Sequence, residues 1–592
     1  MNATAAPLTD PNSRRQLTQG WVEGRIEPNG CHAWRGLRYA APPVGAWRWR
    51  APQPALPWEG TLAALQHGAL APQFSGLLAP GEPAHYGEVI GDEDCLHLAV
   101  FAPHCAADAV PQGQARLPVM VWIHGGGNAV GTANTFDVAS NLAARDGVVV
   151  VTVNYRLGVL GWFTHPALQQ QPDLQPEERS GNFALLDLLA ALRWVQQNIA
   201  AFGGDPDCVT VFGESAGGQQ VLLLMASPLA QGLFHRAIAQ SPVSESFSVE
   251  EAVHGVDVLA DSLRTGTQAR VEDWAAAAGR PDVLGAAPTE VAAFLRHLSP
   301  AQLLAAYRPG SAGIYLAPRP TRDGVVLPLA PLHTLFASGQ FNRVPVILGS
   351  NRDEFRTFLA DKPEHSRLLL GKIPLLRDRA AYLAESGFMS RGWRALHVDR
   401  PADALLTGGH TEVWTYRFDW DEAPAVPFIR PDLLLGACHA AEMPFVFRDR
   451  EGVFDLFKVN TPWNRKSREQ VSDAMAAAWT SFARHGAPRT LPAGVAWPRR
   501  SSIGSQDSLI FDSARDGGLR MAGLRSSLPA LQAELLQGRA AVPAPLRAQV
   551  FARTFLWSPV LAGHATLVDY AEVQQRWGGD PSPQRYRPAV EI

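Results

Sequence analysis

Residues 208–226 read CVTVFGESAGGQQVLLLMA, a short apolar run that meets a serine between glycines and continues as a second apolar segment. The run 208–212 is typical of a strand buried on both faces of a sheet, and 215–226 has apolar residues at helical spacing. Ser215 therefore lies at a predicted strand-to-helix turn. In that context the pattern G-x-S-x-G presents a nucleophilic hydroxyl. The alternative is a glycine-rich turn without chemistry, because the pattern also arises by chance.

A second glycine-rich segment supplies what an attacking serine needs. The stretch IHGGGNAVG, 123–131, directly follows a predicted strand. Glycines let backbone N–H groups approach a substrate oxygen closely, so we expect an oxyanion hole formed by Gly126, Gly127 and Ala216. Taken alone, the glycine run is equally consistent with a flexible loop.

Serine acyl transfer also needs a base and an acid later in the chain. Among 17 histidines, His439 stands out because it opens a turn before the apolar run in GACHAAEMPFVF, 436–447. Asp353 and Glu354 are the candidates for the acid. Both lie just past the end of a predicted strand, where ligand chemistry gathers in α/β sheets. Composition does not distinguish these two carboxylates.

The rest of the chain alternates predicted strands and helices, which indicates an α/β domain with a mostly parallel central sheet flanked by helices. The predicted strands are 117–123, 147–153, 343–349, 413–420 and 508–512, and the longest predicted helix is 182–202. Segments 251–335 and 356–411 are excursions that we expect to form fixed walls around a pocket. We predict a leader over 1–17 without a signal peptide and one large domain over 18–539. A C-terminal extension follows over 540–592, with its last part disordered.

Composition excludes several classes of function. The 592 residues carry a formal net charge of −4, with no basic stripe and no apolar stretch long enough to span a bilayer. We therefore expect neither nucleic acid nor a membrane as partner. The missing signal sequence and only five cysteines favour reduced thiols in the cytoplasm. No CxxC or HExxH spacing occurs, so we predict no metal site and no cofactor.

Several colinear blocks extend well beyond the serine motif. They are WRGLRYAAPPVGAWRW (34–49), EDCLHLAVF (93–101), VWIHGGG (121–127), NYRLG (154–158), NIAAFGGDPDCVTVFGESAGG (198–218), NRDEF (351–355) and HAAEMPFVF (439–447). With these blocks the chain resembles the type-B carboxylesterase/lipase family, which includes bacterial p-nitrobenzyl esterases and the cholinesterases. The resemblance runs from about residue 18 to about residue 515 and implies the α/β-hydrolase fold.

The resemblance implies roles for individual residues. It implies Ser215 as nucleophile, His439 as base and Glu354, not Asp353, as acid. It makes Glu214 a buried carboxylate that supports the turn. It also implies two scaffold ion pairs, Arg156 with Asp187 and Arg48 with Glu93.

The chain also departs from the family pattern. Ala71 stands where the disulfide partner of Cys95 would be, so we expect Cys95 to be a free thiol. Asn128 replaces the usual phenylalanine and Pro242 the usual glycine. We expect both near the acyl pocket, where Asn128 would make the mouth more polar. His85 stands where cholinesterases stack choline on a tryptophan, which argues against choline esters.

Together these features predict a serine carboxylic-ester hydrolase that acts through an acyl-enzyme on soluble short- to medium-chain or aryl esters. The expected partner is this small-molecule ester, and no oligomeric state is indicated. The alternatives are an amidase, carbamate hydrolase or thioesterase using the same residues. A non-catalytic interaction domain is disfavoured, because every triad residue and oxyanion glycine is retained.

Overall fold

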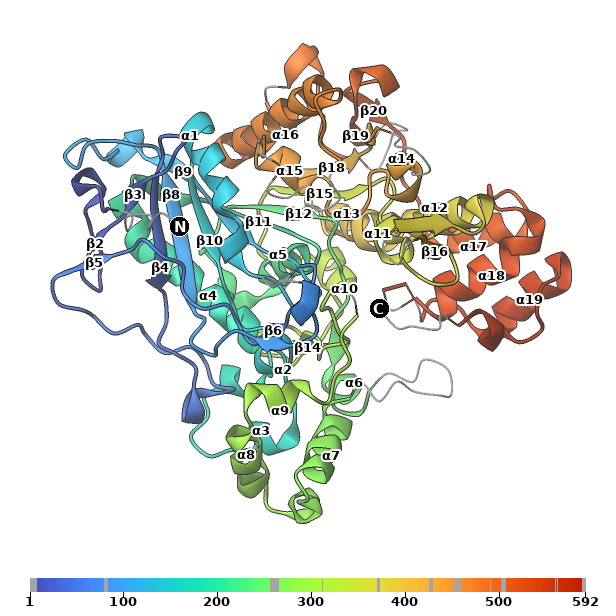
Figure 1. Ribbon diagram of the computed structural model, residues 1–592, viewed down its shortest axis with the longest axis horizontal. Coiled ribbons are helices and arrows are strands. Elements are labelled where there is room, and N and C mark those ends of the chain that lie inside the picture. Colours follow the sequence, from blue (N-terminus) through green and yellow to red (C-terminus); the bar gives the residue numbers. More distant parts are fainter. Residues whose placement is uncertain are drawn as a thin grey trace.

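A large twisted sheet with helices on both faces forms the centre of the protein (Figure 1). The computed structural model describes residues 8–78, 83–255, 266–310, 312–369, 373–424, 430–450, 452, 459–489, 491–501, 507–558, 560–561 and 563–587.

The order of the strands confirms the predicted α/β class. Across the eleven-stranded sheet the order is β20 (Arg520–Ala522), β19 (Ser508–Phe511), β18 (Val413–Phe418), β15 (Val346–Asn351), β12 (Arg236–Gln240), β11 (Gly204–Glu214), β9 (Leu117–Ile123), β10 (Val149–Val153), β8 (His97–Ala102), β4 (His32–Arg38) and β3 (Arg25–Ile26). Neighbours from β19 to β10 are parallel. The flanking strands β20, β8, β4 and β3 join antiparallel. The carboxyl ends of the parallel strands therefore meet along one edge.

The parallel strands are apolar on both faces because helices cover both sides of the sheet. In β9, Val119 and Val121 pack in the cluster under α4 (Phe183–Asn198) and α5 (Ala216–Ala226). Met120 and Trp122 alternate into the opposite cluster, under α1 (Ser140–Asp146) and α16 (Arg465–His485). Period-two alternation thus places successive residues of one apolar run in two separate cores.

Both predicted excursions from the sheet are largely helical. The first contains α7 (Thr267–Ala277), α8 (Pro288–His297), α9 (Pro300–Leu304) and α10 (Leu332–Ala337). The second contains α12 (Arg379–Arg394), a π-helical turn over Ala395–Asp399, and α13 (Arg400–Thr407). Helix α13 packs against α10, so the two excursions support each other.

The C-terminal part of the chain is also helical. Helices α17 (Leu528–Leu536), α18 (Arg547–Phe551) and α19 (Leu567–Trp577) lie beside α12 (Figure 1). Buried residues of all four helices form a third hydrophobic cluster. The division between a domain over 18–539 and an extension stays a prediction, as does the leader over 1–17. Of the part expected to be disordered, residues 588–592 lie outside the described residues.

The scaffold ion pairs form as expected. Arg156 binds Asp187 through Nη2 to Oδ1 at 2.7 Å, and Arg48 binds Glu93 through Nη2 to Oε2 at 2.5 Å. Cys95 is buried, and all five cysteines are free thiols, as expected of Cys95. In the part of the chain described, no helix has the length and apolar character needed to cross a membrane.

Candidate active site

Ser215 occupies the turn between β11 and α5 in a strained conformation. Its φ is +59° and ψ is −120°, and its N–H donates to the carbonyl oxygen of Gln240 at 2.9 Å. A non-glycine residue with positive φ costs free energy, and such residues cluster at functional sites. The side chain is half-buried, so the hydroxyl remains accessible at the carboxyl edge of the sheet.

The glycines on either side of Ser215 are required by close backbone contacts. A Cβ on Gly217 would lie 2.0 Å from the carbonyl oxygen of Ile123, at the end of β9. A Cβ on Gly213 would lie 2.6 Å from the backbone of Gly217. Neither position tolerates a side chain, which is the physical reason for the G-x-S-x-G spacing.

The glycine loop after β9 lies directly beside the serine. A Cβ on Gly125 would lie 3.0 Å from the Cβ of Ser215. The loop then turns through Gly126 and Gly127, with φ of +108° and +65°. Among the described residues, the N–H groups of Gly126, Gly127 and Ala216 donate to no protein acceptor. Three backbone N–H groups without a protein acceptor therefore lie on the two segments that meet at Ser215.

His439 and Glu354 are joined by a short hydrogen bond. Nδ1 of His439 lies 2.6 Å from Oε2 of Glu354, which follows β15 and is fully buried. The other carboxylate oxygen accepts from the Ser241 hydroxyl and from the N–H of Asn351, both at 2.7 Å. Glu354 is therefore held on both sides, and it fixes the orientation of the imidazole.

Asp353 points elsewhere, although it neighbours Glu354 in sequence. Its carboxylate binds Arg352 at 2.8 Å and Arg356 at 3.0 Å, and it accepts from the N–H of Ala437 at 3.1 Å. These contacts leave Asp353 with a structural role in the loop that carries His439.

Glu214 faces the other nitrogen of His439. Oε1 of Glu214 lies 3.1 Å from Nε2, in an orientation that makes no hydrogen bond. Burial raises the pKa of Glu214 to about 8. Burial opposes charge on His439, but the carboxyl groups of Glu214 and Glu354 outweigh it and raise the pKa of His439 to about 9. Nε2 makes no hydrogen bond to Ser215 in this structure.

The expectation that Asn128 makes the entrance to the acyl pocket polar is wrong. The side chain is only 6% exposed and points to α5. Its Nδ2 donates to Gln219 Oε1 at 2.8 Å, and its Oδ1 accepts from Gln220 Nε2 at 2.7 Å. Asn128 therefore ties the glycine loop to the helix behind Ser215. It does not make the mouth polar, because both amide ends are already satisfied inside the protein.

Aromatic side chains enclose His439. The ring of Trp393, on α12, lies 4.9 Å from the imidazole centroid, and that of Phe358, on α11 (Arg356–Leu359), lies 5.2 Å away. Both belong to the cluster that contains the C-terminal helices. Sequence patterns missed Trp393, because nothing in the sequence signals which helix packs on the histidine.

A further buried glutamate was also missed. Glu442 accepts from Asn351 Nδ2 at 2.6 Å and from Gln240 Nε2 at 3.1 Å. It thereby connects the His439 loop to the ends of β15 and β12. Its position in the block HAAEMPFVF was the only available signal, and that block drew attention to the histidine alone.

A mainly parallel sheet, a strained serine on a strand-to-helix turn, and a glutamate–histidine pair at the same edge define an α/β-hydrolase. A family model described as the carboxylesterase family matches residues 11–372 and 396–516. The chain therefore belongs to the carboxylesterase family, and it is an enzyme that hydrolyses carboxylic esters.

Individual relatives agree with this assignment. The para-nitrobenzyl esterase of Bacillus subtilis is 36% identical over 514 residues, covering 83% of this chain and 94% of that protein. The fumonisin B1 esterase of Sphingopyxis macrogoltabida is 33% identical over 524 residues, covering 82% and 85%. A solved PNB esterase aligns with a TM-score of 0.65 at 31% identity, over 86% of this chain and 97% of that one. A Geobacillus stearothermophilus carboxylesterase aligns with a TM-score of 0.62 at 28% identity, over 90% and 100%.

Proposed function

We propose that Ser215, His439 and Glu354 form a catalytic triad that hydrolyses esters through an acyl-enzyme. The observation that supports this best is the 2.6 Å hydrogen bond between His439 and Glu354, at the same sheet edge as a strained, half-buried serine. The serine–histidine hydrogen bond is expected to form in the substrate complex, since such bonds are often long in ligand-free enzymes.

In the first half-reaction, His439 takes the hydroxyl proton as the oxygen of Ser215 attacks the ester carbonyl. Glu354 keeps the Nδ1–H of the ring directed at its own carboxylate and stabilises the imidazolium. The imidazolium then returns the proton to the departing alcohol. In the second half-reaction the same imidazole activates water, which cleaves the acyl-enzyme and releases the acid.

The oxyanion of each tetrahedral intermediate would be held by the N–H groups of Gly126, Gly127 and Ala216. Preorganised donors of this kind stabilise charge that develops only in the transition state. Their lack of protein acceptors supports this role. The link from Asn128 to α5 supports it further, because it holds the donor loop against the helix that follows the nucleophile.

We propose soluble short- to medium-chain or aryl esters as the preferred substrates. The wall formed by Trp393 and Phe358 supports this, because it packs in one cluster with the C-terminal helices and so has little freedom to open as a lid. Amides, carbamates and thioesters are the alternative substrates, since the same acyl-enzyme would serve each.

The specific activity across p-nitrophenyl esters from acetate to palmitate tests this preference. We expect a maximum at a short or medium chain and a fall in kcat/KM of at least about tenfold at palmitate, because one poorly accommodated methylene alone changes it by ~10-fold. The p-nitroanilide of the best acyl group is the control for the leaving group. A maximum at palmitate, with a jump in rate above its solubility limit, would instead indicate a lipase.

The pH dependence of hydrolysis tests the electrostatics around His439. The imidazole accepts a proton only when neutral, and its pKa is raised to about 9. We therefore expect kcat/KM to increase with pH through neutrality and to level off only in the alkaline range. Glu214→Gln removes a carboxyl group 3.1 Å from Nε2, which should lower the pKa of His439. The acid limb of the plot of kcat/KM against pH should therefore move to lower pH.

Asp353→Asn is the matched control for that variant. It also removes a buried carboxylate, but one that follows β15 and binds Arg352 and Arg356 instead of facing His439. The acid limb should keep its position in this control. A wild-type midpoint near the ordinary histidine value, unchanged in Glu214→Gln, would contradict the role given to Glu214.

We also propose a cytoplasmic location. Five cysteines without a disulfide are consistent with a reducing compartment.

A further inference from the structure

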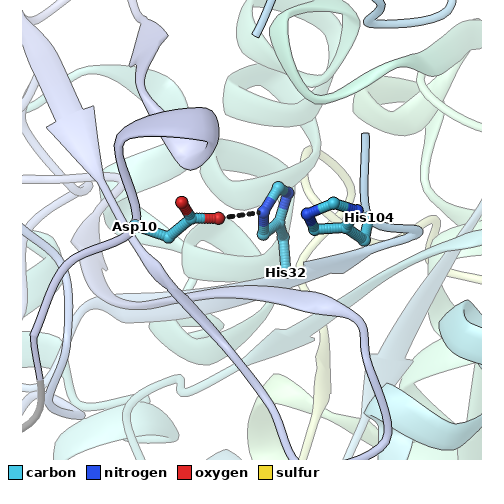
Figure 2. Close-up of side chains that lie close together, drawn as sticks. All are labelled: Asp10, His32 and His104. Carbon is cyan, nitrogen blue, oxygen red and sulfur yellow. Dashed lines mark hydrogen bonds and ion pairs between the residues drawn. The ribbon is translucent and has the colours of Figure 1, made fainter. Parts of the chain in front are cut away.

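Three potential metal ligands from separate segments gather far from Ser215 in the fold. They are Asp10, just before a 3₁₀ turn over Pro11–Ser13, His32, the first residue of β4, and His104, two residues past β8. Figure 2 shows the Asp10 carboxylate on one side of the His32 ring and the His104 ring on the other. One ligand atom from each residue lies within 4.8 Å of the other two.

Strand register places this group at the opposite edge of the sheet from Ser215. His32 pairs with Ala102 at the end of β8, and Phe101 pairs with Val150 at the start of β10. Because β10 and β11 both run parallel to β9, this is the edge where the parallel strands begin. Ser215 follows the carboxyl end of β11. The group is therefore separate from the ester-hydrolysing site.

The spacing suits a coordinated ion after a small adjustment. Oδ2 of Asp10 and Nε2 of His32 are 2.7 Å apart. Ligand atoms bound at ~2.1 Å to one tetrahedral zinc ion lie roughly 3.4 Å apart, so this pair would have to separate slightly to admit the ion. His104 is exposed, and its ring can turn to bring the third atom in.

Hydrogen bonds already orient the Asp10 carboxylate toward His32. Oδ1 of Asp10 accepts from the N–H of Asn12 at 3.1 Å, while Oδ2 lies against Nε2 of His32. A carboxylate and a neutral imidazole are the forms of these side chains that bind metals. Nδ1 of His32 is buried without a hydrogen-bond partner in the described part of the chain.

Two neighbouring side chains, Arg15 and Cys105, can affect metal binding by these residues. Arg15 brings a positive charge, although its guanidinium donates to the carbonyl oxygens of Asn12 and Arg14 and lies over Trp34, 5.3 Å from the ring centroid. Its Nη2 also lies 3.5 Å from Sγ of Cys105, which is a possible competing ligand beside His104. An experiment must therefore distinguish a site with Asp10 from a site with Cys105.

We propose that Asp10, His32 and His104 bind a divalent transition-metal ion, zinc foremost, with water completing the coordination. Two imidazoles and one carboxylate are a donor set that zinc and its first-row neighbours accept. The ion would fasten the N-terminal segment to β4 and to the end of β8. Such a clamp stabilises the folded state in proportion to its occupancy, since the unfolded chain does not hold the three ligands together.

The test is a zinc titration of EDTA-treated full-length protein, followed by competition with a chromophoric chelator. We expect one saturable site per chain. Asp10→Asn and His104→Ala should each weaken binding ~10- to 100-fold, the range known for losing even a supporting contact at a metal site. Asp10→Asn retains an oxygen that can accept from the N–H of Asn12, and His104 is exposed, so both variants should fold.

Two variants serve as matched controls. His85→Ala removes another exposed histidine with a carboxylate partner, Glu88 at 3.0 Å, and should bind zinc like the wild type. Cys105→Ser should also bind normally. Zinc should raise the unfolding temperature of the wild type and of both controls, but not of His104→Ala.

The absence of a saturable site, or unchanged binding in both Asp10→Asn and His104→Ala, would overturn the proposal. So would loss of binding in Cys105→Ser with retention in Asp10→Asn, which would identify a cysteine–histidine site instead. Hydrolysis of p-nitrophenyl esters should be the same with and without zinc. The outcome is thus independent of the function proposed for Ser215.

Discussion

Ser215→Ala should abolish ester hydrolysis, with kcat reduced roughly 10⁶-fold, the loss measured when a triad nucleophile is removed. Without the hydroxyl no acyl-enzyme forms, and only oxyanion stabilisation and binding remain. Alanine keeps a Cβ, as serine does, so the strained backbone at φ +59° should be retained and the variant should fold. Steady-state hydrolysis of a p-nitrophenyl ester measures the effect.

A fluorophosphonate probe provides the second measurement for this prediction. It should label Ser215 alone, because that hydroxyl lies at the edge where an imidazole can activate it. Ser227→Ala is a suitable control, since Ser227 is a buried serine at the other end of α5. Labelling should be unchanged in this control and absent in Ser215→Ala. An adduct on another serine would show that the nucleophile had been misassigned.

Glu354→Gln should lower kcat about 10⁴-fold, as removal of the orienting carboxylate does in a serine triad. Glu354 accepts from Nδ1 of His439 at one oxygen and from the N–H of Asn351 at the other. A glutamine has a single acceptor oxygen, so its NH₂ must face one of these two groups. If the NH₂ faces His439, Nδ1 can no longer donate a hydrogen bond and the imidazole takes the wrong tautomer. If it faces Asn351, two N–H donors oppose each other.

Asp353→Asn is the control that distinguishes the two neighbouring carboxylates. It should leave turnover per folded molecule nearly unchanged, because Asp353 binds Arg352 and Arg356 and does not contact the imidazole. Any loss should appear as reduced thermal stability. If Asp353→Asn lost more activity than Glu354→Gln, the acid of the proposed triad would be the wrong residue.

Local sequence was sufficient for the strand that leads to the glycine loop. Continuous apolar runs are read as strands because both faces of the sheet are covered, and β9 has the predicted bounds of 117–123. Strand ends were less predictable. The run 147–153 begins as a strand only at Val149, because Gly147 adopts φ +63° to end α1. A left-handed glycine depends on where the preceding helix stops, which the apolar pattern does not encode.

The residues alone did not distinguish Asp353 from Glu354 as the acid of the proposed triad. The family resemblance favoured Glu354. The contacts give the physical difference between them. Adjacent residues after a strand point in different directions, so one carboxylate meets His439, 85 positions away, while the other meets arginines of its own loop. The direction in which each carboxylate points depends on how loops from different strands converge. A local sequence pattern does not encode it.

The sequence by itself determined the fold class, the strand-to-helix turn at Ser215 and the glycine loop, because each depends on contacts within a few residues or on strand and helix periodicity. Only the tertiary structure decided that Asn128 turns inward to α5, that Trp393 covers His439, and that Asp10 meets two histidines. These side chains find partners on segments distant in sequence. Their roles follow from packing of the whole chain, because most buried polar groups are hydrogen-bonded and the partner can lie on any segment that packing brings near.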